Sequence, residues 1–381
     1  MSSIKKKASN LTEWKRIAQD LLDQAGIEIN GSRPYDIQIH NDHFYQRVME
    51  EGSIGLGESY MDGWWDCEKL DLFFTKVMRA KLDEKLPSSF KDILKILFAR
   101  LRNLQSKKRA WIVGEEHYDL GNDLFTAMLD PYMQYSCGYW AEATTLEAAQ
   151  QAKLDLICRK LQLEPGMKLL DIGCGWGGLS AYAAEHYGVS VTGVTISKEQ
   201  QKLAQARCQS LDVEIILEDY RDLNGAFDRI VSVGMFEHVG PKNYRKYFEV
   251  AHRNLKEDGL FLLHTIGSNN NQYNVDPWIE KYIFPNGELP SIQKIANASQ
   301  GKFVMEDWHN FGADYDRTLM AWAERFLEHW PELEANYSPR FKRMFIYYLM
   351  ACAGAFRARS IQLWQILWSP LGVEGGIRVA R

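Results

Sequence analysis

The feature that most constrains the fold is a short apolar segment that runs directly into a glycine-rich turn. Residues 168–178 read KLLDIGCGWGG, and a helical pattern follows from Leu179 to His186. Glycine lets a backbone turn tightly and approach a ligand without a Cβ clash. The pattern therefore predicts a strand, turn and helix that hold a nucleotide-type cofactor at the first strand–helix junction of an α/β sheet.

The segments that follow alternate between strand-like and helical patterns. Five apolar segments predict strands at 168–172, 190–195, 213–217, 227–233 and 260–266. Helical patterns lie between them, for example at 197–209 and 242–255. Such alternation predicts a parallel sheet with helices on both faces. Two long aromatic helices are predicted at 318–330 and 340–359, before a strand-like end. The expected fold class is therefore α/β, with a Rossmann-like domain over residues 113–381.

The amino-terminal part has a different pattern. Residues 1–86 predict a smaller mixed domain, with helices at 12–25 and 43–51 and an aromatic-flanked turn at 61–65. We interpret this part as a lipid-docking or dimer-forming domain rather than as an active site.

Residues 87–112 predict a basic amphipathic linker helix. Seven Lys and Arg residues accompany its apolar stripe, against one Asp. On a chain of net charge −5, such a helix is typical of attraction to an anionic membrane surface. A linker helix packed between two domains explains the pattern equally well.

Composition and spacing exclude several classes of protein. The net charge of −5 argues against bulk nucleic-acid binding. The six cysteines are scattered, without the close pairs of zinc or redox motifs. The start is basic but lacks an apolar signal core, and no apolar segment approaches the roughly 20 residues of a membrane span. We therefore expect a cytoplasmic protein with free thiols.

The glycine-rich turn departs from the pattern of NAD-binding proteins. That pattern runs Gly-x-Gly-x-x-Gly, with a carboxylate near the end of the second strand. Here the turn has Gly173, Gly175 and Gly177, and the second strand ends without an acid. The third strand is followed by Asp219 and Tyr220. This arrangement resembles the S-adenosylmethionine site of class I methyltransferases.

That resemblance implies a role for each part of the site. The methionine part would be lined by Asp171, Gly173, Cys174 and Gly175, and the ribose edge by Thr195, Ile196, Ser197 and Gln200. Asp219 and Tyr220 would face adenine. Two alternatives stay open: Asp171 only braces the turn through backbone hydrogen bonds, and Gln200 is a solvated helix start.

Two polar residues fall where the chemistry of such a fold takes place. Glu237 follows the fourth predicted strand, and His264 lies near the end of the fifth. Ligands of open α/β sheets bind at the carboxyl ends of the strands, so we expect these residues to meet near the donated methyl. A buried histidine alone is as often a core residue, but its pairing with a carboxylate at a cofactor mouth favours a functional role.

Longer motifs resemble one family closely. They occur at residues 116–125, 132–140, 171–178, 235–241, 282–287, 306–312 and 352–357. They resemble the bacterial cyclopropane-fatty-acyl-phospholipid synthase and mycolic acid cyclopropane synthase family over essentially the whole chain. The resemblance implies an enzyme that uses S-adenosylmethionine to build a cyclopropane ring on the cis double bond of a membrane phospholipid acyl chain. It also implies a homodimer, peripheral on the inner face of the cell membrane.

The resemblance extends to individual residues. It implies a bicarbonate ion near the donated methyl, held by Cys137, Glu237, His264, the backbone N–H of Ile266 and Tyr315. It also places Tyr135 and Ser136 in the cofactor site and suggests Cys352 as catalytic, although a cysteine in an apolar helix is more often packing. A Cys–Glu–His set could instead hold a metal, but these ligands lack a close pair, and we expect no metal.

A carbocation in an apolar tunnel needs stabilisation that does not trap it, and aromatic faces provide it. The candidate tunnel residues are Tyr135, Tyr139, Trp140, Tyr273, Phe284, Phe311 and Tyr315. One alternative function is an O- or N-methyltransferase of a small polar molecule. Another is a lipid-surface binding module without activity, against which the intact Gly173, Gly175, Glu237 and His264 argue.

Overall fold

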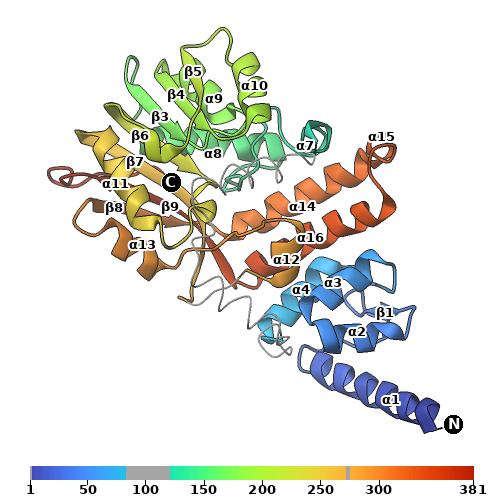
Figure 1. Ribbon diagram of the computed structural model, residues 1–381. Helices are drawn as coiled ribbons and strands as arrows, with labels where there is room; N and C mark the ends of the chain where they lie inside the picture. The colour runs from blue at the N-terminus through green and yellow to red at the C-terminus, as the bar shows by residue number, and fades with distance from the viewer. Residues whose placement is uncertain (1, 83–120, 272–274) are drawn as a thin grey trace. The chain divides into compact units, whose positions relative to one another are not determined.

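The computed structural model describes residues 2–82, 121–271 and 275–381 (Figure 1). The predicted basic helix, the first part of the 116–125 motif and Tyr273 lie outside these residues. The chain divides into two compact units, the first of residues 1–102, 276–284 and 319–360, the second of residues 103–275, 285–318 and 361–381. Within the described residues, no helix is both apolar enough and long enough to span a bilayer.

The first unit is mostly helical. Its elements are α1 (Ser2–Asp23), β1 (Gln38–Ile39), α2 (His43–Glu51), α3 (Ser53–Met61), β2 (Trp65–Asp66), α4 (Leu70–Arg79), α12 (Pro277–Tyr282), α15 (Trp330–Leu333) and α16 (Pro339–Arg357). The prediction of a helix at 43–51 is confirmed, and the helix predicted at 12–25 begins earlier and ends at Asp23. Residues 276–284 and 319–360, which the sequence alone groups with the carboxyl-terminal part, belong to this unit.

Close packing explains why α16 belongs to the first unit. A Cβ added to Gly354 would lie 2.5 Å from the Cβ of Phe74 and 3.0 Å from the carbonyl oxygen of Asp71, so α16 and α4 pack where no side chain fits. Arg357 forms an ion pair with Asp71, and Arg343 pairs with Asp66 at 2.7 Å. Helix α16 is thus fixed to the amino-terminal helices by both packing and charge.

The second unit is built on one seven-stranded sheet with the order β5-β4-β3-β6-β7-β9-β8. Its strands are β3 (Lys168–Ile172), β4 (Ser190–Thr195), β5 (Val213–Leu217), β6 (Phe227–Val233), β7 (Leu255–Ser268), β8 (Val304–Asn310) and β9 (Ile361–Ser369). Four predicted strands are confirmed at their bounds, and the fifth, β7, is longer than predicted.

The prediction of a purely parallel sheet is wrong at one side. Strands β3 to β7 pair in parallel, but β9 runs antiparallel to β7, and β8 runs antiparallel to β9. The edge strand β8 carries charged and aromatic residues together and lacks an apolar run. Its pattern therefore gives no strand signal of the kind that marks the buried parallel strands.

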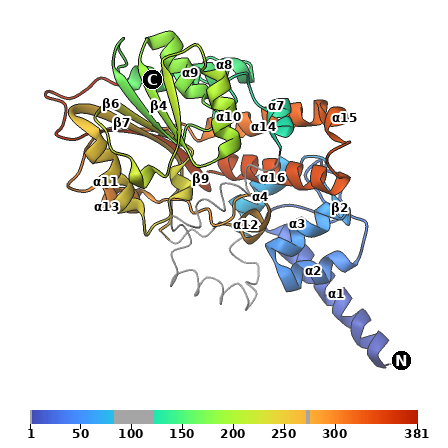
Figure 2. The ribbon, with the colours of Figure 1, turned by 45° about the horizontal axis from the view of Figure 1, so that its top comes forward.

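Helices cover both faces of the sheet, as predicted. They are α7 (Asn122–Met128), α8 (Leu146–Lys160), α9 (Gly178–Tyr187), α10 (Lys198–Arg207), α11 (Tyr244–Asn254), α13 (Ile292–Ser299) and α14 (Ala313–Glu328), which continues into the first unit. Figure 2 shows α8, α9 and α10 on one side of the strands and α11 and α13 on the other. Neighbouring strand residues face opposite sides: Leu262 packs in the cluster with α8 and α9, and Leu263 in the cluster with α11 and α13.

Candidate functional site

The glycine-rich turn is fixed to the end of the neighbouring strand. Gly173, Gly175 and Gly177 have φ angles of +85°, +55° and +76°, a region that side chains other than glycine rarely adopt. The backbone N–H groups of Gly173 and Cys174 both donate to the carbonyl oxygen of Val194, at 2.9 Å. The positive φ angles and the two backbone hydrogen bonds to Val194 therefore define the conformation of the turn between β3 and α9.

Asp171 is buried, and its Oδ2 accepts a hydrogen bond from Ser180 Oγ at 2.8 Å. Burial raises the pKa of Asp171 to about 6. The backbone hydrogen bonds of the turn go to the Val194 carbonyl, and the bracing role of Asp171 rests on its bond with Ser180. Asp171 thus ties the end of β3 to the first turn of α9.

The residues expected at the ribose edge form a connected set after β4. Ser197 caps α10, its Oγ accepting from the N–H of Gln200 at 3.3 Å, and Thr195 Oγ1 donates to Gln200 Oε1 at 2.9 Å. Gln200 is only 5% exposed, so the alternative of a solvated helix start is wrong. Ile196 lies between the two hydroxyl residues, in the segment that they fix.

Asp219 and Tyr220, expected to face adenine, differ in their hydrogen bonding. Both carboxylate oxygens of Asp219 accept from the Arg221 guanidinium, at 2.7 and 2.6 Å, so a ligand would share them with Arg221. The hydroxyl of Tyr220 is buried without a hydrogen-bond partner among the described residues. Burial raises the pKa of Tyr220 to about 12, so the hydroxyl keeps its proton.

The structure places the two polar residues at the carboxyl ends of neighbouring strands. Val233 of β6 pairs with His264 of β7, and Glu237 follows β6 in the short helix η2 (Phe236–His238). Glu237 Oε1 accepts from the N–H of Ile266 at 2.7 Å. The Ile266 amide, expected to bind an anion, therefore donates to Glu237 here. Glu237 Oε2 is buried with no hydrogen-bond partner among the described residues, and burial raises the pKa of Glu237 to about 7.

His264 also has a buried ring nitrogen, Nε2, without a hydrogen-bond partner among the described residues. Gln365 Nε2 lies 3.3 Å from His264 Nδ1. With the Gln365 amide placed this way, its N–H donates to Nδ1, and the neutral imidazole then carries its proton on Nε2. Nε2 is buried without a partner among the described residues, and burial keeps the pKa of His264 well below its usual value. His264 Nε2 and Glu237 Oε2 are thus two buried polar atoms without a partner among the described residues, on segments at the carboxyl ends of neighbouring strands.

The segment that carries Cys137 is held by the first turns of α14. Gly138 N donates to Thr318 Oγ1 at 3.1 Å, and Trp140 N donates to Asp314 Oδ2 at 2.7 Å. These bonds bring Cys137 to the helix that carries the buried Tyr315. Burial raises the pKa of Cys137 well above its usual value, so it presents a neutral thiol.

An aromatic contact links this segment to His264. The ring of Phe311 lies 5.8 Å from that of His264 and 5.4 Å from that of Tyr139, measured between centroids. Of the other tunnel candidates, Phe284 belongs to the first unit, where it packs on Tyr348.

Cys352 belongs to the first unit, on α16. Burial raises the pKa of its thiol to about 12, so it is protonated at neutral pH. This favours the interpretation of Cys352 as a packing residue.

Two polar residues of α8 were missed by sequence reasoning. Lys153 Nζ donates to Gln134 Oε1 at 2.5 Å and to Ser136 Oγ at 2.9 Å. Gln150 Nε2 donates to the carbonyl oxygens of Gln134 and Ser136, at 3.3 and 2.8 Å. Both residues are 0% exposed. A signal existed, because Gln150 and Lys153 interrupt a stripe that Leu146, Ala149, Leu154 and Ile157 otherwise make apolar.

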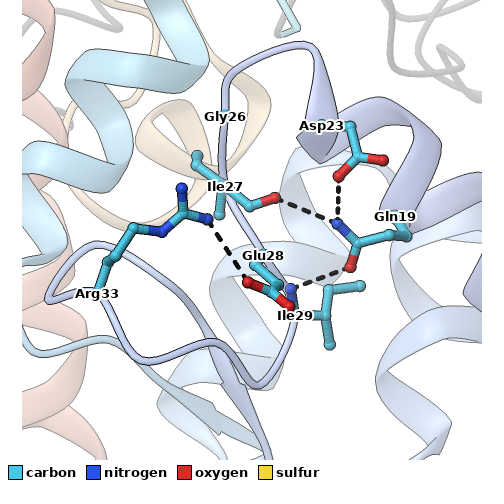
Figure 3. Close-up of a pocket in the computed structure, with 7 residues that line it drawn as sticks. All are labelled: Gln19, Asp23, Gly26, Ile27, Glu28, Ile29 and Arg33. Atoms are coloured by element: carbon cyan, nitrogen blue, oxygen red, sulfur yellow. Dashed lines mark hydrogen bonds and ion pairs between the residues drawn. The ribbon is translucent and has the colours of Figure 1, made fainter.

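A surface pocket in the first unit does not form part of this site. It is lined by residues between Gln19 and Arg33, and Figure 3 shows their polar groups bonded to one another. Gln19 bonds to the side chain of Asp23 and to the backbones of Ile27 and Ile29, and Arg33 pairs with Glu28. None of these residues is among those predicted for the site.

Comparisons with known proteins agree on one family. Residues 105–366 match the family model described as mycolic acid cyclopropane synthetase. The chain is 70% identical over 368 residues to the cyclopropane-fatty-acyl-phospholipid synthase of Escherichia coli strain K12, covering 97% of this chain and 96% of that protein. It is 38% identical to the cyclopropane mycolic acid synthase MmaA2 of Mycobacterium tuberculosis strain H37Rv, over 66% of this chain and 94% of that protein.

Solved structures give the same result for the fold. The structure of MmaA2 from M. tuberculosis aligns with a TM-score of 0.65 at 36% identity, covering 68% of this chain and 97% of that one. Mycolic acid cyclopropane synthase CmaA1, solved with SAH and CTAB, aligns with a TM-score of 0.64 at 34% identity and the same coverage. Coclaurine N-methyltransferase, at 20% identity and a TM-score of 0.65 over 83% of this chain and 99% of that one, shares the methyltransferase fold.

Proposed function

The chain belongs to the mycolic acid cyclopropane synthetase family, and we propose that it converts the cis double bonds of phospholipid acyl chains into cyclopropane rings with S-adenosylmethionine as the carbon donor. The observation that carries the proposal is the pair of unused polar atoms, Glu237 Oε2 and His264 Nε2, buried at the carboxyl ends of β6 and β7. The same edge of the sheet carries the glycine-rich turn.

The glycine-rich turn and the related structures both support S-adenosylmethionine as the methyl donor. CmaA1 was solved with SAH, the product that S-adenosylmethionine leaves after methyl transfer. In this chain the candidate cofactor residues are Tyr135, Ser136, Asp171, Gly173, Cys174, Gly175, Thr195, Ile196, Ser197, Gln200, Asp219 and Tyr220. The buried hydroxyl and amide groups of Thr195, Ser197 and Gln200 suit a ligand that carries its own hydroxyls.

The reaction needs a proton acceptor at the donated carbon. The alkene attacks the sulfonium methyl, the C–S bond breaks, and a carbocation forms on the acyl chain. One proton must then leave the new methyl so that its C–H electron pair closes the ring. Glu237 suits the acceptor end of this step, because burial brings its pKa to about 7 and Oε2 has no other partner among the described residues.

An oxyanion would satisfy both orphan atoms. His264 Nε2–H can donate to it, and Glu237 Oε2 can accept the proton of an acid anion. Cys137 and Tyr315 complete the proposed set, although in this structure the Cys137 thiol donates to the Gly138 carbonyl oxygen. We propose bicarbonate as that ion, which when bound supplies the proton acceptor. The aromatic contact of His264 with Phe311 keeps the cradle apolar on one side, as a carbocation intermediate requires.

The test of the reaction is mass spectrometry of unsaturated phospholipid vesicles incubated with the protein and S-adenosylmethionine. A gain of one CH₂ with loss of the alkene is the expected result. Methylation of small soluble acceptors without vesicles, and no change in the lipid, would instead support an O- or N-methyltransferase. Vesicle binding without consumption of S-adenosylmethionine would support a binding module.

Bicarbonate dependence is a separate prediction. We expect the initial rate to fall severalfold in CO₂-free buffer and to recover when sodium bicarbonate is added, because His264 and Glu237 then regain their shared partner. Sodium chloride at the same ionic strength is the control. A rate that is unchanged in CO₂-free buffer would make Glu237 itself the base.

The substrate also implies where the enzyme works. We propose that it acts as a homodimer in peripheral contact with the inner face of the cell membrane, because its acyl substrate resides in a bilayer. Vesicle flotation and light scattering of the full chain test the two parts of this proposal independently.

A further inference from the structure

We propose that the Lys153 ammonium binds the α-carboxylate of the methionine part of S-adenosylmethionine, next to Ser136. The inference rests on the proposed use of that donor. It gives a role to a buried charged side chain that the chemistry described above does not use.

Lys153 is a buried cation that forms no ion pair among the described residues, although the carboxylates of Asp130 and Asp171 favour its charged form from a greater distance. Its side chain is 0% exposed, and no carboxylate of the described residues lies within 4.0 Å of its Nζ. An ammonium has three N–H donors. Two of them meet neutral acceptors, Gln134 Oε1 and Ser136 Oγ. A third donor and a full charge therefore remain for a ligand, and burying a charge is costly unless it is paired.

The position of Lys153 points to the amino-acid end of the ligand. The segment that it holds passes over the start of α9, because a Cβ added to Gly178 would lie 1.9 Å from the Tyr132 carbonyl oxygen and 2.4 Å from Gln134 Nε2. The same ammonium opposes the rise that burial causes in the pKa of Asp171 at the end of β3. Lys153 thus lies near the turn that is expected to hold the methionine part.

The charge state of Lys153 suits this role. Burial lowers the pKa of Lys153 to about 8, so the ammonium is largely protonated at neutral pH. A bound carboxylate would stabilise the charged form. Binding of a carboxylate ligand should therefore weaken as the pH rises through about 8, where the free enzyme loses this proton.

The experiment compares two ligands on two variants. SAH carries the amino-acid part, and 5′-methylthioadenosine lacks it. Lys153→Met keeps the length and removes the charge. Gln150→Leu is the matched control, because Gln150 holds the same segment through the carbonyls of Gln134 and Ser136 but is neutral. Calorimetric titration of the full chain at pH 7 measures the affinities, and circular dichroism checks the fold.

We expect Lys153→Met to weaken SAH binding by about 30-fold and 5′-methylthioadenosine binding by less than about threefold, as for loss of one partner of a buried ion pair. Gln150→Leu should weaken both ligands by the same factor. An equal loss of both ligands in Lys153→Met would overturn the proposal and leave Lys153 a structural residue. So would a change confined to the bicarbonate dependence of the rate, which would assign the charge to that anion.

The wild-type chain provides an independent test if Lys153→Met fails to fold. The ratio of SAH affinity to 5′-methylthioadenosine affinity should fall between pH 7 and pH 9, as the Lys153 ammonium is lost. A constant ratio over that range contradicts the proposal. Failure of lipid cyclopropanation with this pH dependence intact would instead count against the proposed reaction alone.

Discussion

Replacement of Glu237 by glutamine is expected to lower turnover at least about 100-fold while SAH affinity stays within about threefold of the wild-type value. The amide keeps an oxygen for the Ile266 N–H, which Glu237 Oε1 accepts at 2.7 Å, so the local structure is preserved. The NH₂ group that takes the place of Oε2 cannot accept the proton of the proposed bicarbonate, and loss of a group in such a proton-transfer step typically costs a factor of about 10² to 10⁴. Initial rates on unsaturated vesicles and calorimetric titration with SAH measure the two quantities.

The pH dependence makes this prediction specific. Burial raises the pKa of Glu237 from 4.5 to about 7, and in the proposed mechanism its ionised form accepts the proton of the bound bicarbonate. Wild-type turnover should therefore rise with pH up to about 7, and any residual rate of Glu237→Gln should lack that rise. Glu288→Gln is the matched control, because Glu288 pairs with Lys294 and contacts Glu237 only through its backbone N–H. A Glu237→Gln enzyme with normal turnover would remove Glu237 from the mechanism.

Stability should change in the opposite direction from activity. For a carboxyl whose pKa is raised on folding, the stabilisation is complete below the unfolded pKa and is lost as the pH rises through the folded pKa. For Glu237 this loss runs from about pH 4.5 to about 7. Glu237→Gln stays neutral, so its Tm at pH 8 should equal or exceed that of the wild type. A lower Tm would show that lost turnover reflects misfolding.

Gly178→Ala is expected to weaken SAH binding more than about 30-fold and to lower stability by about 3 kcal/mol, as for severe overpacking. The added methyl would lie 1.9 Å from the carbonyl oxygen of Tyr132, which is backbone and cannot rotate away. The segment that carries Tyr135 and Ser136 must then move off the start of α9. Chemical denaturation and calorimetry with SAH measure the two effects.

Gly166→Ala is the control for this change. Gly166 precedes β3 with a φ of +85°, and nothing lies within 4 Å of its added Cβ. It should lose about 1 kcal/mol from backbone strain and keep its SAH affinity. Equal SAH affinity in Gly178→Ala and the wild type would contradict the close approach of the 132–136 segment to α9.

The parts of the site that were predictable are those that follow from local pattern and sheet topology. The strands at 168–172 and 227–233 are apolar and bounded by turns, so their bounds were confirmed. The placement of Glu237 and His264 at one edge of the sheet followed from the rule that the carboxyl ends of neighbouring parallel strands share that edge. Glycine at three positive-φ positions gave the turn.

The rest depends on contacts between distant segments. The N–H of Ile266 donates to Glu237, and the N–H groups of the turn donate to the carbonyl oxygen of Val194. Neither follows from sequence spacing, because each depends on which backbone group lies nearest after the strands have packed. The contact of Lys153 with Ser136 was unpredictable for the same reason. A helical pattern shows that a polar residue lies in the buried stripe, but it does not show which distant residue that side chain contacts.

The position of β9 has a consequence for biosynthesis. This strand lies between β7 and β8, although residues 361–369 are made long after β7 at 255–268. During translation, one edge of β7 therefore stays unpaired while roughly a hundred further residues are made. Gln365 contacts His264 only after β9 has paired with β7. We therefore expect the unpaired edge of β7 to be a chaperone-binding surface until β9 docks.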